Sequence, residues 1–150
     1  MMKKSRAAVL LCGMLAVSIL AGCGGGGAYK DGTYEGKSSV FEGEEEDGSG
    51  AGYGVVSLTI KDGKIADCTF TTYEPDGTLK DSDYGKQDGE IANQDFYNKA
   101  QRAVQASGKY AERLVEAGNL ADVDSITGAS ISYKEFQEAV NDALDQAQGK

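Results

Sequence analysis

The 150-residue sequence contains no histidine. Histidine is the usual general base near neutral pH and the commonest metal ligand in proteins. Its absence excludes Ser-His and Cys-His nucleophile pairs, His-ligated metal sites and haem held by an axial histidine. Any chemistry must therefore come from carboxylates, hydroxyls, a thiol or a bound cofactor, and we assign no catalytic residue and no metal site.

Long apolar runs are scarce. The longest, from Ala7 to Ala21, follows three basic residues, as in the charged and apolar regions of a secretory signal, and is too short for a comfortable transmembrane helix. Its end, Leu20-Ala21-Gly22-Cys23, resembles the lipobox of bacterial lipoproteins, whose cysteine is lipidated and becomes the mature N-terminus. The resemblance implies that Cys23 anchors the chain in membrane lipid on the extracytoplasmic face of the cell membrane. An ordinary signal peptide that contains a cysteine is the alternative.

Basic residues are outnumbered by acidic ones, 15 to 24. Removing the signal, residues 1–22, leaves 128 residues with 12 basic and 24 acidic side chains, and therefore a net charge of −12. That length suits one domain with a core, and that charge repels nucleic acid. Gly24 to Gly27 form a flexible tether. We therefore expect a lipoprotein signal over 1–22, the lipidated cysteine and tether over 23–29, and one domain over 30–150.

Cysteine is also rare, because Cys12 lies in the signal and Cys23 would carry lipid. Cys68 is then the only cysteine left in the domain, so no intramolecular disulfide can form. It lies in a predicted hairpin, where apolar residues alternate with polar ones at Val56, Leu58 and Ile60, then at Ala66, Cys68 and Phe70. A three-residue loop over 61–63 would pair Leu58 with Ala66 and keep the apolar face continuous. Cys68 is then a small buried hydrophobe and not a nucleophile.

The remaining pattern predicts strands followed by helices. We expect the opening Asp31–Gly36 to lead into a strand that ends at about Phe41, followed by a loop over 74–90 with a turn at 75–77. Three helices are expected over 91–107, 110–117 and 133–146, the first two ended by Gly108 and Gly118. A hairpin followed by helices indicates an α+β fold, with an antiparallel sheet and helices packed on it in a single small domain.

The segment from Glu42 to Gly52 is acidic and rich in glycine, which predicts a loop. Four consecutive carboxylates at 44–47 suggest a calcium site. They lack the alternating spacing of a calcium-binding loop, so a solvated run is the preferred interpretation.

The segment from Asp124 to Ser130 carries small and hydroxyl residues directly before a helix. Ser132 and Glu135 fit a capping box, which predicts a helix beginning at Tyr133 with Ser132 as its N-cap. Ser130 would then lie where free backbone N–H groups and the helix dipole favour an anion. Ser130 is thus a candidate phosphate-ester site, with a plain serine-capped loop as the alternative.

The residues Asp124-x-x-Thr127-Gly128-Ala129-Ser130 resemble the Asp-x-x-Ser/Thr-Gly-Ala-Ser/Thr signature of the FMN-binding domain family, which includes FMN-bearing subunits of the sodium-pumping NADH:quinone reductase. In that family a flavin transferase takes FMN from FAD and joins its phosphate to the last hydroxyl. The resemblance implies covalent FMN on Ser130, with Thr127 as the only nearby substitute. The transferase would read Asp124, Thr127, Gly128 and Ala129.

The similarity extends over about residues 30–147 and includes the opening Asp31-Gly32-Thr33-Tyr34-x-Gly36. Many members carry threonine at the acceptor position, where this chain has serine. A Thr-Pro-Gly loop found near the flavin in several relatives is missing, and Tyr84-Gly85 is expected in its place. Candidates to stack on the flavin are Tyr53, Tyr73, Tyr84, Phe96, Tyr97 and Tyr133. Lys134 is either a surface lysine or a partner for the phosphate.

The resemblance implies a lipid-anchored extracytoplasmic flavoprotein that carries electrons between redox partner proteins or small electron acceptors, and is a carrier more than a stand-alone enzyme. Two alternatives remain open. One is a flavin-free envelope lipoprotein that binds a ligand or protein, and the other is an electron-relay subunit of a multi-chain reductase.

Overall fold

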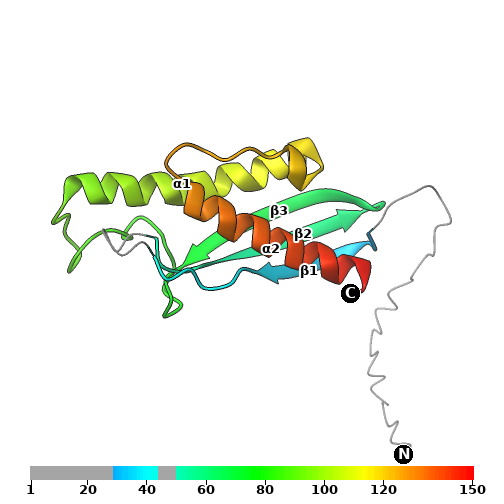
Figure 1. Ribbon diagram of the computed structural model, residues 1–150, viewed down its shortest axis with the longest axis horizontal. Coiled ribbons are helices and arrows are strands. Elements are labelled where there is room, and N and C mark those ends of the chain that lie inside the picture. Colours follow the sequence, from blue (N-terminus) through cyan, green and yellow to red (C-terminus); the bar gives the residue numbers. More distant parts are fainter. Residues whose placement is uncertain (1–28, 44–49) are drawn as a thin grey trace, which may run out of the picture.

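The computed structural model describes residues 29–43 and 50–150. Strands β1 (Gly32–Lys37), β2 (Tyr53–Lys61) and β3 (Lys64–Tyr73) form one antiparallel sheet in the order β1-β2-β3. They are followed by helix α1 (Gln94–Ala117), the short 3-10 helix η1 (Leu120–Asp122) and helix α2 (Ser130–Gln148). Helix α1 packs on β3, and α2 crosses β1 and β2 (Figure 1). The predicted α+β class, an antiparallel sheet with helices packed on it in a single small domain, is confirmed.

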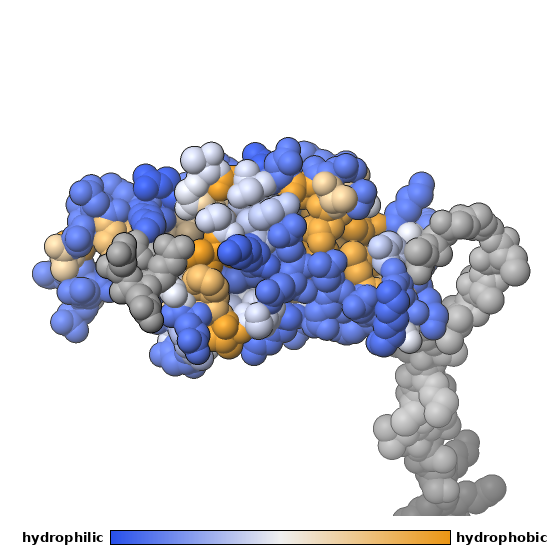
Figure 2. All heavy atoms as spheres, in the orientation of Figure 1, coloured by the Kyte–Doolittle hydropathy of each residue, from blue (hydrophilic) through white to orange (hydrophobic). Residues whose placement is uncertain are grey.

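Several predictions fall outside the described residues. These are the signal over 1–22, the lipidation site Cys23, the tether up to residue 28 and the calcium site considered at 44–47. Within the described ranges, neither helix has the length and apolar composition needed to cross a bilayer. The face in Figure 2 is largely hydrophilic, with apolar residues gathered in a few patches.

The hairpin between β2 and β3 closes through two residues, and the predicted three-residue loop is wrong. Asp62 and Gly63 have φ values of 53° and 71°, and Lys61 pairs with Lys64. Two successive residues with positive φ are the mark of a type I′ turn, whose twist matches that of the strands.

The apolar face stays continuous because β3 contains a bulge. The pairing shifts between Thr59 and Ile60, so that Ala66 has no partner on β2 and is exposed. Beyond the shift Leu58 lies opposite Cys68, and both are buried. An unbulged two-residue hairpin would place a polar residue on the core face, and the extra residue of the bulge corrects this.

The core lies between one face of the sheet and the two helices. Its largest fully buried side chains come from the sheet, both helices and the segment before α2, and are Val56, Leu58, Tyr110, Leu114, Val123, Phe136 and Val140. The ring of Phe136 lies 5.1 Å from that of Phe70 and 5.5 Å from that of Tyr110, measured between centroids. Cys68 belongs to this core, and burial raises the pKa of its thiol to about 12, as expected of a buried hydrophobe rather than a nucleophile.

Helix α2 approaches β1 very closely. A Cβ atom on Gly36 would lie only 1.9 Å from the backbone oxygen of Ala139 and 2.6 Å from the backbone nitrogen of Ala143. Both alanines are fully buried. Glycine is therefore required at this crossing, where the backbones of helix and strand meet.

Two predicted element boundaries are wrong. Helix α1 continues through Gly108, where we expected two helices, because Ser107 and Tyr110 on either side are buried and hold the helix against the sheet. Strand β1 ends at Lys37, and Phe41 makes only an isolated bridge to Gly52. The predicted helix end at Gly118, which has φ 70°, is confirmed, as is the turn after β3 at residues 75–77.

Candidate functional site

A pocket of about 190 Å³ lies between helix α1, the first half of α2 and the loop after β3. Its walls come from segments far apart in the sequence. The lining residues are Gly50, Thr72, Lys80, Tyr84, Phe96, Lys99, Ala100, Ala103, Val104, Gly128, Ala129, Ser130, Ile131, Ser132 and Glu135. Helix α1 contributes mostly apolar residues together with Lys99, whereas hydroxyl and charged groups come from α2 and from the loop after β3.

The small-residue segment ends in a tight turn that leads into α2. The backbone N–H of Ala129 donates to the carbonyl of Ile126 at 3.0 Å, and Gly128 has φ 81°. A glycine is favoured there because side chains rarely tolerate that φ. Ser130 follows as the first residue of the helix and is exposed.

The predicted capping box is wrong. Helix α2 begins at Ser130 instead of Tyr133, and its N-cap is Ala129, which makes no side-chain capping hydrogen bond. Ser132 and Glu135 are both buried and line the pocket, so neither side chain serves as a cap. The first N–H groups of the helix therefore have no capping side chain, and the positive end of the helix dipole lies at Ser130.

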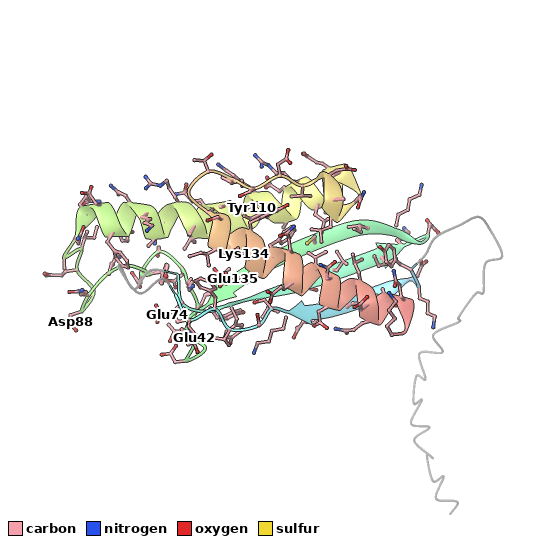
Figure 3. All side chains as sticks on the ribbon, in the orientation of Figure 1. Glu42, Glu74, Asp88, Tyr110, Lys134 and Glu135 are labelled. Atoms are coloured by element: carbon pink, nitrogen blue, oxygen red, sulfur yellow. The ribbon has the colours of Figure 1, made fainter. Side chains whose placement is uncertain are left out.

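Two tyrosines hold this segment to the core. The hydroxyl of Tyr110 accepts a hydrogen bond from the backbone N–H of Ile126 at 2.8 Å and donates one to the carbonyl of Ala129 at 3.1 Å. The hydroxyl of Tyr133 donates to the carbonyl of Val123 at 2.6 Å. Tyr110 belongs to α1, is fully buried and lies on the α1 side of α2 (Figure 3). The position of Ser130 is thus set by the core and not by the loop alone.

The five predicted site residues do not all meet at the pocket. Gly128, Ala129 and Ser130 line it, whereas Asp124 and Thr127 are exposed on the preceding loop and do not. The carbonyl of Asp124 accepts a hydrogen bond from Arg113 at 3.3 Å. Asp124 and Thr127 are therefore accessible to another protein.

The predicted aromatic residues also separate into groups. Tyr84 and Phe96 line the pocket. Tyr53 and Tyr73 stack on each other, with centroids 5.4 Å apart, and their alternation with buried Gly54 and Thr72 places them on the sheet face away from the helices.

Of the remaining predicted residues, none lines the pocket. The ring of Tyr133 packs against Tyr110, and the hydroxyl of Tyr97 donates to the carbonyl of Ser82. Lys134 is exposed. Lys134 is therefore a surface lysine beside the site, and the pocket's own cations are Lys80 and Lys99.

Sequence reasoning missed a buried pair of ionisable residues in the pocket. Glu135 is 3% exposed and Lys80 is 8% exposed. Burial raises the pKa of Glu135 to about 7, although the charge of Lys80 opposes the shift. Burial also lowers the pKa of Lys80, with Glu135 acting in the opposite direction. The only signal in the sequence was an acidic residue next to Phe136 on the inward side of α2.

Lys80 is positioned by the backbone that follows β3. Its N–H donates to the carbonyl of Thr72 at 2.9 Å. Its Nζ donates to the carbonyl of Gly50 at 3.4 Å and lies 5.0 Å from the centre of the Tyr84 ring. The described ranges contain no group of three or more acidic or cysteine side chains placed to hold a metal ion.

Comparison with known proteins identifies one domain family and one fold relative. The family model of the FMN-binding domain matches residues 50–145, well over half of the chain. The crystal structure of the CPE2226 protein from Clostridium perfringens is 20% identical, and the alignment covers 81% of this chain and 90% of that one with a TM-score of 0.56. This likeness shows a shared fold. Curated proteins yield no match.

Proposed function

This chain belongs to the FMN-binding domain family and is a flavin-binding protein, and on that premise we propose that it carries electrons through FMN joined covalently to Ser130. The observation that carries the proposal is the position of Ser130. It is the exposed first residue of α2, follows the tight turn at Gly128 and lines the pocket. A phosphate bound there would face the N-terminal amides of the helix.

The residues of the pocket suit a flavin. Phe96 and Tyr84 offer aromatic surfaces to a planar ring, and Ala100 and Val104 complete the apolar wall. In the same lining, a buried carboxyl oxygen of Glu135 has no hydrogen-bond partner in the described part of the chain, so a polar edge of the ring would satisfy it. The volume is below the roughly 300–1,000 Å³ of pockets that bury a whole drug-sized ligand, so the pocket would enclose part of the cofactor.

FMN, when bound, supplies the electron-transfer chemistry, and the chain's own residues attach it, orient it and set its electrostatic surroundings. We further propose that Cys23 carries lipid and that the domain works on the extracytoplasmic face of the cell membrane. A covalent bond suits that location, because a dissociable cofactor would be lost by dilution. The electrons would come from a redox partner protein and pass to another protein or a small electron acceptor.

The direct test is co-expression with a flavin transferase, followed by denaturation and mass spectrometry. We expect a yellow protein whose mass rises by that of FMN minus water. Ser130→Ala should lose the adduct completely, whereas Ser125→Ala, an exposed hydroxyl on the same segment that is not among the residues the transferase would read, should keep the bond at Ser130.

Each contrary outcome has a distinct meaning. Retention of the adduct in Ser130→Ala and its loss in Thr127→Ala would move the acceptor to Thr127. A colourless wild-type protein, under conditions in which a control substrate is modified, would contradict the carrier proposal and favour a flavin-free binding module. Cys23→Ala should shift the protein from the membrane fraction to the soluble fraction.

A further inference from the structure

Glu135 lies on the same helix as the proposed attachment site and opens into the same pocket (Figure 3). Glu135 lies five positions after Ser130, which is about 7.5 Å along a helix axis. Lys80 enters the pocket from the loop after β3. A flavin tethered at Ser130 and lying in this pocket would therefore lie beside a carboxyl group and an ammonium group.

The carboxyl group of Glu135 is incompletely satisfied. Oε1 is buried and has no hydrogen-bond partner within the described residues, and the whole residue is only 3% exposed. None of the ion pairs between described residues joins it to Lys80. An unpaired buried carboxylate is costly, and the cost falls when the group takes up a proton or meets a ligand.

Within the described part of the chain, few other charges surround Glu135. Lys80 and Tyr84 face the pocket from the loop after β3, and Lys99 faces it from α1. Glu138 acts on Glu135 from the same helix, and Glu74 acts on Lys80. The strands contribute only uncharged neighbours, such as Gly54, against whose Cβ position the Glu135 side chain packs. Among the described residues, burial and Glu138 raise the pKa of Glu135, whereas Lys80 lowers it.

We propose that Glu135 is a redox-linked proton site, which binds a proton from solvent when the flavin in this pocket is reduced. The inference rests on the proposed function. Electrons arrive from the external reductant and place negative charge beside the carboxylate. A proton from water then joins a carboxylate oxygen to form the carboxylic acid, and the same proton returns to water when the electrons leave. Lys80 limits the shift by favouring the carboxylate.

Geometry and ionisation agree on this role. Burial raises the pKa of Glu135 to about 7 before a reduced flavin adds negative charge. A nearby negative charge raises a carboxyl pKa further. Above about pH 7, Glu135 therefore begins as a carboxylate and ends as an acid, so that one additional proton accompanies reduction.

The first experiment uses the wild-type chain expressed without the transferase and therefore free of FMN. Carboxyl ¹³C NMR should show one glutamate that titrates near pH 7 and disappears in Glu135→Gln. Lys80→Met should raise the pKa of that signal, because the opposing positive charge is gone. Titration of Glu135 near its ordinary value of 4.5 would overturn the proposal whatever the flavin does.

The second experiment measures the midpoint potential of the FMN-loaded protein from pH 5 to 9, by titration with dithionite. One additional proton changes the equilibrium tenfold per pH unit, which is about 30 mV for a two-electron couple. Wild type should show this extra slope above about pH 7, and Glu135→Gln should lose it. Glu138→Gln, a carboxylate one turn further along and outside the pocket, should keep it.

The outcomes separate the two proposals. A loaded Glu135→Gln protein with the same slope as wild type would overturn the proton site and leave the carrier proposal standing. Failure of the chain to acquire FMN, established by mass, would overturn both.

Discussion

The two halves of helix α2 differ in what they contact. The first half carries Ser130, Ser132 and Glu135 along the pocket. The second half carries alanines and lies so close to β1 that Gly36 has no room for a side chain. Small apolar residues allow close packing, which stabilises the fold, whereas the buried carboxyl group of Glu135 lowers stability. The comparison indicates that the packing of the second half of α2 offsets the stability lost by burying a carboxyl group in the first half.

The largest expected effect on stability comes from disrupting the close contact between the second half of α2 and β1. Gly36→Ala should reduce the free energy of unfolding by about 3 kcal/mol, because the new Cβ would overlap backbone atoms of Ala139 and Ala143 and α2 would have to move. Urea denaturation followed by circular dichroism measures the change.

The matched control for this variant is Gly108→Ala. Gly108 lies within α1, and an added Cβ would have no neighbour within 4 Å. Alanine should therefore raise the free energy of unfolding by about 0.5–1 kcal/mol through helix propensity. Equal effects at the two glycines would show that the close crossing of α2 over β1 does not stabilise the fold.

The second expected effect is a pH dependence of stability caused by Glu135, in the first half of α2. The folded pKa of Glu135, about 7, is above its ordinary value of 4.5, so the folded state binds more protons than the unfolded state between these values. Stability from this group is fully present below about pH 4.5 and is lost as the pH rises through 7. The loss should be about 3 kcal/mol in the flavin-free protein, and Glu135→Gln should abolish it.

Glu138 offers the opposite case on the same helix. Hydrogen bonds from Ser39 lower the pKa of its carboxyl group, so its contribution is present above the unfolded pKa and lost as the pH falls through the folded pKa. Thermal unfolding across pH 3 to 8 should therefore show that the contribution of Glu138 to stability increases with pH, whereas the contribution of Glu135 decreases. A stability that does not fall between pH 4.5 and 7 would contradict the burial of a titrating Glu135.

The smallest effect concerns the link between the core and the attachment site. Tyr110→Phe removes a hydroxyl that bonds both Ile126 and Ala129, and should reduce the free energy of unfolding by about 1 kcal/mol. The segment before Ser130 would be held less firmly, so the transferase should attach FMN more slowly.

Tyr34→Phe is the control for this variant, because the Tyr34 hydroxyl bonds Lys30 at an exposed position away from the pocket. It should change stability by less than about 0.5 kcal/mol and leave the attachment rate unchanged. Attachment rates are measured from the mass change over time. Equal rates in wild type, Tyr110→Phe and Tyr34→Phe would show that Tyr110 does not position the attachment site.

Some features were readable from local patterns. Alternation of period two marked β2 and β3, and inward residues such as Phe136 and Val140 marked α2, because burial on one face imposes the period of the backbone. The segment from Asp124 to Ser130 was recognisable for a similar reason, since its residues are consecutive. The α+β class followed from the order of these elements.

Other features were decided only by the tertiary structure. The bulge at Ala66 depends on the opposite strand, and the start of α2 at Ser130 depends on the turn and the tyrosines that hold it. The pocket depends on the meeting of Lys80, Phe96 and Glu135, which are distant in the chain. Periodicity reports which face of an element is buried but not what the face meets, so the sequence determined the elements and the attachment motif, whereas packing alone determined the charged pocket beside it.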